Sequence, residues 1–434
     1  MRRFIDGPAL GDLGLWSTVS TTTNYNIVAD TTSTRAGDTY GFHASRVVGF
    51  SGAGCYIAVN ISSAGSNLIA PADPAGLGYA RSLVSDGNKD RVFVRFYFKI
   101  ATAPATFGAG FYLFRFQESG GTFPFSILYT SGGVIQMITG GSEQQVIFTP
   151  TVGTWYRLEI ALGNTSAGSV MSAHAFTEDS FTPIGGGSRI YVNPTSLLAP
   201  RLGFQPVNTG LAGSGAVDIY FSTIGVNDNQ IPGVNDNYLG PGKIVEYRPN
   251  ADATPLDLTS TAGTHSTEVD DAPAWPPDGN TTTVTTPVTT SAVEDNYDFA
   301  SYAGGANIKV VQAHCYYRNF ASAVTLGTDH RAGIVDSGGT RLERVLPLNN
   351  DDNYRYAGTI INGTGANGNT AWTTSEFDNA ATEILLRRPS VSALGTNQRL
   401  VWSGVALQVE DDDGLSGLVN PFTTDRHRPR GQVI

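Results

Sequence analysis

Paired carboxylates are the first residues to look for, because hydrolysis of a polysaccharide needs two of them facing one bond, about 5 to 10 Å apart. The densest acidic group is Glu268-Val269-Asp270-Asp271. Residues two apart share one face of a strand, but this group lacks a closing Glu and lies in a segment rich in Pro and Thr. We therefore predict a solvated acidic loop and no catalytic residues.

Metal ligands show no stronger pattern. The triplets at 227–229, 235–237 and 351–353 offer Asn and Asp oxygens of the kind that calcium binds, but they lack the spacing of a calcium loop with its distant bidentate Glu. The six histidines include no His-x-x-x-His or Cys/His pair for zinc, and His314 lies on an alternating strand as a packing residue. We predict no metal and no cofactor, and the pattern leaves open whether the Asn-Asp-Asn turns hold calcium.

Two further catalytic patterns are missing. Gly185-Gly186-Gly187 has the composition of a phosphate loop, but no Lys-Ser or Lys-Thr follows it and no helix begins there, so we predict a flexible turn. A Gly-x-Ser-x-Gly nucleophile motif does not occur between a strand and a helix. The chain is therefore predicted not to be an enzyme.

Surface recognition is the chemistry that the residues favour. Glycan sites on β-sandwiches combine aromatic faces with planar polar side chains. The outward faces of the early strands supply such candidates: Phe93, Arg95, Tyr97, Arg115, Gln117 and Gln136. A sugar groove and a contact with a second layer or a neighbouring subunit are both open interpretations of this face. Trp155 and Trp402 are predicted to be core or interface anchors.

The elements that carry these side chains are predicted to be strands, because apolar and polar residues alternate along them. Residues 91–100 and 155–162 each place one face in a core. Residues 111–117 are predicted to put Tyr112 on the same face as Phe114 and Phe116, with Arg115 on the other. Glycine pairs between the following strands indicate an antiparallel meander.

A tandem repeat divides the chain, because Gly225-Val226-Asn227-Asp228-Asn229 recurs at 233–237 and such residues favour turns. We predict an all-β fold of two β-sandwich, jelly-roll-like domains. They cover residues 1–225 and 243–410, with a hinge at 226–242 and an extended C-terminal arm at 411–434. Within the second domain, residues 251–296 are predicted to be mostly loop and 373–382 a short helix.

Composition agrees with an all-β protein, since 51 of 434 residues are Gly and only 15% are charged. The formal charge of −11 argues against binding of nucleic acid. No apolar stretch reaches the ~20 residues that cross a bilayer, and Asp6 and Asp12 interrupt any secretion signal. We expect a soluble protein made in a cytoplasm, with Cys55 and Cys315 as buried free thiols.

Short motifs in two parts of the chain resemble known protein families. Two motifs support a first resemblance: Gly153-Thr154-Trp155-Tyr156-Arg157-Leu158-Glu159-Ile160, and the strand VDIYFSTIGVND, which ends at Asp228. With them, residues 1–235 resemble a concanavalin A-like, laminin-G-type jelly roll. Tyr247-Arg248-Pro249-Asn250, the run at 277–282 and the run at 372–377 resemble a segment that follows such jelly rolls in structural proteins of tailed bacteriophages. Those proteins usually carry Tyr where this chain has Thr283.

The resemblance implies a noncatalytic virion protein, tail-associated or a capsid decoration, with lectin-like adhesion to host surface glycans. It further implies a homo-oligomer that contacts other virion proteins. Two alternatives stay open: a carbohydrate-binding module or adhesin without a virion role, and a polysaccharide hydrolase or lyase.

The last residues, 411–434, combine an acidic start, a basic end and few apolar residues, so they cannot form a core of their own. We predict an arm that docks on a neighbouring copy or another virion protein. Phe422 would be its apolar anchor, and Arg426, Arg428 and Arg430 would pair with acidic groups. A mobile terminus is the alternative.

Overall fold

The computed structural model describes most of the predicted strands and few of the long connections. The described residues are 2–6, 18–21, 25–30, 32–36, 38, 41–46, 54–58, 68–69, 91–102, 110–118, 123–140, 143–165, 168–191, 197–206, 216–228, 239–261, 263–270, 281–302, 308–319, 330–336, 338–346, 354–361, 372, 377, 382–391 and 399–411. They form 27 β-strands and a single 3-10 helix. The predicted all-β fold is confirmed.

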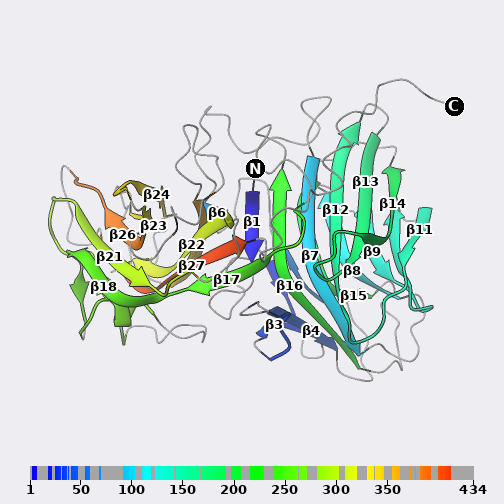
Figure 1. Ribbon diagram of the computed structural model, residues 1–434, viewed down its shortest axis with the longest axis horizontal. Helices are drawn as coiled ribbons and strands as arrows, with labels where there is room; N and C mark the ends of the chain where they lie inside the picture. Colours follow the sequence, from blue (N-terminus) through cyan, green and yellow to red (C-terminus); the bar gives the residue numbers. More distant parts are fainter. Residues whose placement is uncertain are drawn as a thin grey trace.

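The first sandwich consists of sheets A and B (Figure 1). Sheet A has the order β14 (Pro183–Tyr191), β13 (Gly168–Thr177), β12 (Trp155–Thr165), β7 (Arg91–Thr102), β16 (Val217–Asp228), β4 (Gly41–Arg46) and β3 (Tyr25–Asp30), with β1 (Arg2–Asp6) beside β16. Sheet B has the order β11 (Glu143–Phe148), β10 (Ile135–Thr139), β9 (Phe125–Tyr129), β8 (Phe111–Glu118), β15 (Leu197–Pro206), β5 (Cys55–Ala58) and β2 (Thr18–Ser20). Their inner faces meet in an aromatic core, in which Phe96 and Phe114 stack at 5.8 Å.

The second sandwich consists of sheets C and D. Sheet C has the order β19 (Thr259–Ser260), β20 (Val284–Thr285), β27 (Leu400–Asp411), β22 (Ile308–Asn319), β25 (Arg355–Ile361) and β6 (Leu68–Ile69), with β17 (Lys243–Tyr247) also beside β27. Sheet D has the order β18 (Pro249–Leu256), β21 (Val293–Phe299), β26 (Glu383–Arg388), β23 (Arg331–Val335) and β24 (Arg341–Val345). Trp402 is fully buried in the core between them, as an anchor should be.

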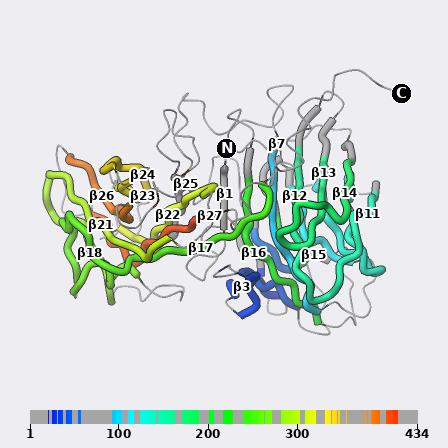
Figure 2. The backbone as a smooth tube through the Cα atoms, viewed as in Figure 1, coloured from blue at the N-terminus to red at the C-terminus, as the bar shows by residue number. Residues whose placement is uncertain are grey.

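The two sandwiches lie side by side (Figure 2), and strand pairing links them to the chain at more than one place. β17 leaves the first sandwich and pairs with β27 of the second. In the other direction, β6 comes from the N-terminal part of the sequence but pairs in parallel with β25. The predicted boundary at residue 225 therefore does not separate the two sandwiches cleanly.

Several sequence-based predictions are wrong in detail. β16 continues through the first copy of the repeat, because Val226 is buried and lies opposite Val94 of β7. The stretch 251–296 contains β19, β20, the start of β21, most of β18 and the 3-10 helix η1 (Ser266–Glu268), but fewer than half of its described residues belong to these elements, so it is mostly loop as predicted. The three glycines at 185–187 belong to β14 instead of a flexible turn.

Glu268 is also misjudged, because it is 1% exposed and not solvated. Its carboxylate accepts hydrogen bonds from the Ser260 hydroxyl at 2.7 Å, from the Thr261 amide at 2.7 Å and from the Gly263 amide at 2.8 Å. Three donors compensate the buried charge, so this carboxylate has a structural role in a loop of the second sandwich.

Other predictions are confirmed or lie beyond the described residues. Cys55 and Cys315 are buried free thiols. Among the described residues no helix has the length and apolar character needed to cross a membrane. The second Asn-Asp-Asn triplet and the triplet at 351–353, nearly all of the helix expected at 373–382, and the arm after Asp411 with Phe422, Arg426, Arg428 and Arg430 lie outside the described residues.

Candidate functional site

The middle of the outer face of sheet A is covered. Arg95 of β7 is completely buried, and its Nη1 donates to Glu410 Oε1 of β27 at 2.8 Å and to the Gly240 carbonyl at 3.1 Å. Its Nε donates to the Thr223 carbonyl at 3.3 Å. The guanidinium thus joins the first sandwich to the second through a buried ion pair.

Tyr97 and its neighbours continue this junction. The Tyr97 hydroxyl donates to Asp179 at 3.0 Å and accepts from the Gly242 amide at 3.1 Å. Arg35 lies 3.9 Å above the Tyr97 ring and pairs with Asp38 at 3.1 Å. Asp38 in turn accepts from the Ile244 amide at 3.3 Å. Residues 239–244 are therefore held against the sheet by its own polar side chains.

This placement corrects part of the predicted glycan groove. Phe93, Arg95 and Tyr97 do point away from the core of the first sandwich, but they are 3%, 0% and 0% exposed. A carbohydrate cannot reach them in this structure. The alternating pattern identifies an outward face, but it carries no information on what covers that face.

The same face is open farther along the strands, where one row of side chains crosses four of them. The register places Trp155 of β12 opposite Lys99 of β7, Lys99 opposite Tyr220 of β16, and Tyr220 opposite His43 of β4. All four side chains are half-exposed. We call these four residues the aromatic row. Trp155 is thus not a core anchor, and the other predicted role, an interface anchor, stays a prediction.

Close contacts order the aromatic row. Lys99 Nζ lies 5.0 Å from the Trp155 ring and 4.8 Å from the Tyr220 ring. The His43 and Tyr220 rings stack at 4.5 Å with an interplanar angle of 13°. His43 Nε2 lies 2.9 Å from Asp218 Oδ1, so the carboxylate fixes the orientation of the imidazole. The row therefore offers flat apolar surfaces, one cation and an imidazole–carboxylate pair.

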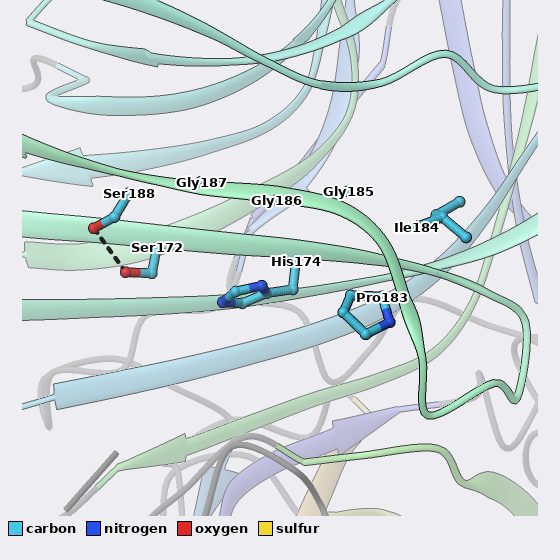
Figure 3. Close-up of a pocket in the computed structure, with 8 residues that line it drawn as sticks. All are labelled: Ser172, His174, Pro183, Ile184, Gly185, Gly186, Gly187 and Ser188. Carbon is cyan, nitrogen blue, oxygen red and sulfur yellow. Dashed lines mark hydrogen bonds between the residues drawn. The ribbon is translucent and has the colours of Figure 1, made fainter. Parts of the chain in front are cut away.

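A shallow hollow of about 680 Å³ lies beside the covered region, over β13 and β14 (Figure 3). His174 stands in it, and the Ser172 and Ser188 hydroxyls bond to each other at 3.0 Å. A Cβ on Gly186 would come within 2.7 Å of His174 Nδ1, so the glycine leaves room for the imidazole.

The remaining predicted glycan residues lie on the opposite side of the sandwich, on sheet B. Arg115 of β8 and Gln136 of β10 are half-exposed there, and the Gln117 side chain lies outside the described residues. The six predicted residues therefore do not form one site. Lys99, Tyr220 and His43 were missed, although Tyr220 and Lys99 alternate with buried residues in the same strands that the pattern identified.

The described residues offer no metal centre. The described part of the chain contains no group of three or more His, Cys, Asp or Glu residues that could hold a metal ion. His314 is completely buried next to Gln312 at 3.1 Å, and burial lowers its pKa to about 3. It is a neutral packing residue, as the alternation predicted.

Comparisons with known proteins identify no family. No protein-family model matches the sequence, and no curated protein does. Similar solved structures include a sialidase (13% identity, 49% of this chain, TM-score 0.28), of which the chain spans 18% of the length. They also include the alginate lyase Aly36B (11% identity, 43% of this chain and 80% of that one, TM-score 0.28) and an alginate lyase from Alteromonas sp. 272 (10% identity, 48% and 94%, TM-score 0.28).

These structures contradict the prediction that the chain is not an enzyme, because they are enzymes themselves. We therefore do not retain that prediction. At such TM-scores the likeness carries no argument about a reaction or substrate of this chain. The proposals below rest on its own residues.

Proposed function

We propose that this protein binds carbohydrate through the aromatic row on the outer face of sheet A. The observation that carries the proposal is the alignment of Trp155, Lys99, Tyr220 and His43 in one half-exposed cross-strand row. Aromatic rings cover the apolar face of a sugar, while nearby polar groups bond to its hydroxyls. The aromatic row places both aromatic rings and polar groups on neighbouring strands.

The dimensions of the aromatic row suit a short oligosaccharide. Neighbouring strands lie about 4.8 Å apart, so the four strands that carry the row span about 14 Å. The row is held by interior strands of a packed sheet, and a rigid platform loses little conformational entropy on binding. Lys99 and the His43–Asp218 pair supply donors and an acceptor at this platform.

Cleavage of an acidic polysaccharide is a second candidate, which the His43–Asp218 contact favours. An imidazole held by a carboxylate can act as a general base, here on the proton next to a uronate carboxylate. Lys99 would stabilise the negative charge that develops on that carboxylate, since a fixed cation in this position lowers the barrier. The electron pair of the broken C–H bond would form a carbon–carbon double bond as the glycosidic bond breaks, and the departing oxygen would take a proton from water, which leaves an unsaturated sugar.

Binding is tested by titration with a panel of neutral and acidic oligosaccharides. The wild-type protein should bind at least one of them, and Tyr220→Ala should weaken that binding by about 1 to 2 kcal/mol, as expected for loss of an aromatic contact. Val146→Ala is the matched control, because this residue is exposed on β11 of sheet B, away from the aromatic row. Equal affinities for wild type and Tyr220→Ala would refute the proposal.

Cleavage is tested separately by following the ultraviolet absorbance of unsaturated uronate products. His43→Gln should abolish the signal, and it should weaken binding less than Tyr220→Ala does, because the Trp155 and Tyr220 rings remain in place. Absence of products with every acidic polysaccharide that binds would rule out the lyase candidate, while carbohydrate binding would stand.

We also propose, on the sequence resemblance alone, that the protein is part of a tailed-phage particle with other virion proteins. Electron microscopy of particles labelled with an antibody to this chain tests this location. Label on the tail or the head would support it, and particles without label would contradict it.

A further inference from the structure

The outer face of sheet B carries two adjacent arginines stacked on aromatic rings. Arg115 of β8 lies directly opposite Arg201 of β15 in the register. The Arg115 guanidinium lies 3.5 Å from the Phe123 ring centre and 4.4 Å from that of Tyr112. The Arg201 guanidinium lies 4.8 Å from the Phe123 ring and 4.4 Å from the Tyr56 ring. Phe123 thus bridges the two cations.

Irregularities in both strands create this arrangement. The register shifts between Tyr112 and Phe114, because Leu113 is an extra buried residue in β8. Tyr112 therefore shares the outer face with Arg115, contrary to simple alternation. Gln205 of β15 lies opposite Tyr112 and brings an amide to the same face. We call Tyr56, Tyr112, Arg115, Phe123, Arg201 and Gln205 the arginine–aromatic cluster.

A glycine brings β5 close to the strand that carries Arg201 and Gln205. Gly203 lies between these two residues in β15, and its φ of +149° is unfavourable for other residues. A Cβ there would come within 2.3 Å of the Cys55 carbonyl oxygen. The close approach of the β5 backbone therefore requires glycine at this position.

Two donor atoms of the arginine–aromatic cluster have no acceptor among the described residues. Arg115 Nε and Gln205 Nε2 are buried atoms for which the described residues provide no hydrogen-bond partner, and Gln205 is 4% exposed. Burial lowers the pKa of Arg115, and the charge of Arg201 lowers it further. Burial also lowers the pKa of Arg201. The site would be stabilised by a negative charge.

We propose that the arginine–aromatic cluster is a second binding site, which takes the carboxylate of an acidic saccharide. Guanidinium groups bind carboxylates through two parallel hydrogen bonds, and the half-exposed rings of Tyr56 and Phe123 provide a flat surface for the sugar. An extended peptide fits less well. β8 and β15 are interior strands, so their backbone groups are paired with neighbouring strands and are not free to pair with a peptide.

This site goes beyond the proposed function, because it lies on the sheet opposite the aromatic row. The two sites differ in whether they need an anionic group. The aromatic row takes neutral and acidic sugars through stacking, whereas the arginine–aromatic cluster requires an anionic group. A protein with both would bind an acidic polysaccharide on two faces and cross-link neighbouring chains of it.

The experiment is a calorimetric titration of the full chain with oligogalacturonate, a saccharide with one carboxylate per sugar. Arg115→Gln should weaken binding to this site at least tenfold. Arg115→Lys should recover only part of the affinity, because an ammonium keeps the charge but loses the planar pair of donors. Arg341→Gln is the control, since it removes an equal charge from a half-exposed side chain of the second sandwich.

Each result has a clear meaning. Similar losses in Arg115→Gln and Arg341→Gln would overturn the proposal and show nonspecific attraction of a polyanion. Equally tight binding of polyglutamate that Arg115→Gln also weakens would overturn it in favour of an acidic protein partner. A neutral oligosaccharide that retains its affinity for Arg115→Gln but loses it in Tyr220→Ala would show that the aromatic row works whatever happens at sheet B.

Discussion

Arg95 and Arg115 occupy equivalent positions in the sequence pattern and opposite situations in the structure. Both alternate with core residues of a strand in the first sandwich. Arg95 is sealed under residues 239–244 and paired with Glu410, whereas Arg115 is half-exposed and stacked on two aromatic rings. The first guanidinium joins two sandwiches, and the second is available to a ligand. An outward arginine becomes a structural or a binding residue according to what covers it.

The largest expected effect concerns the buried member of this pair. Arg95→Met removes the partner of a buried carboxylate, and the free energy of unfolding should fall by about 3 to 5 kcal/mol. Arg115→Met should change it by less than about 1 kcal/mol, because that side chain has no ion pair among the described residues. Urea unfolding followed by tryptophan fluorescence measures both.

A compensating variant sharpens this result. Arg95→Met combined with Glu410→Gln removes both buried charges and should regain part of the lost stability. Equal stabilities of the Arg95→Met and Arg115→Met proteins would show that the junction does not depend on its ion pair.

Glu246 is a second buried charge near the junction, and it predicts a dependence on pH. Burial raises its pKa from 4.5 to about 7, although Arg248 opposes this shift. The folded state thus binds a proton on Glu246 more tightly than the unfolded state does. The resulting contribution to the free energy of unfolding is full below about pH 4.5 and is lost as the pH rises through 7. The loss should be about 3 kcal/mol.

Unfolding measured at several pH values checks this contribution. Glu246→Gln, which stays neutral, should be relatively more stable at pH 8 than at pH 5 when compared with the wild type. A constant difference between the two proteins across this range would contradict the raised pKa.

Tyr97 and Trp155 extend the comparison within a single sheet. Tyr97→Phe leaves buried hydrogen-bonding groups without their hydroxyl partner and should cost about 1 to 2 kcal/mol of stability, with no change in carbohydrate affinity. Trp155→Ala should do the reverse and weaken carbohydrate binding by a similar amount. Thermal unfolding measures the stability of both variants, and calorimetry measures their carbohydrate affinity. A loss of affinity in Tyr97→Phe alone would place the ligand at the junction.

The smallest expected effect is at Tyr112, whose ring lies 4.4 Å from the Arg115 guanidinium. Tyr112→Leu removes a cation–π contact of about 0.5 to 1 kcal/mol. A loss of this free energy should lower the affinity for oligogalacturonate by a factor of about 2 to 5, and the affinity for neutral sugars should not change. An unchanged affinity would mean that this ring does not orient the guanidinium for binding.

The sequence predicted the strands well and the covered surfaces poorly, for one physical reason. A period of two shows which side chains leave the core, and it placed Arg95 and Tyr97 correctly on an outward face. It cannot show that a distant segment lies over that face. Arg95 contacts Glu410, which is 315 residues away in the sequence, and Gly240, which is 145 residues away.

Two local features also escaped the pattern. The irregularity at Leu113 moves Tyr112 to the other face, and no alternation rule identifies an extra residue in advance. The aromatic row needs the register of β12, β7, β16 and β4 at once, and a sequence does not give the pairing of strands that lie far apart in the chain. A half-exposed Trp155 could have been suspected, because it begins its strand directly after a turn.

The central claim is that carbohydrate binds on the aromatic row of sheet A. A crystal structure of the protein soaked with the tightest-binding oligosaccharide tests it most directly. We predict sugar rings lying on Trp155 and Tyr220, with hydroxyl or carboxylate groups within hydrogen-bonding distance of Lys99 and His43. An ordered saccharide elsewhere on the first sandwich, with the aromatic row empty, would contradict the account.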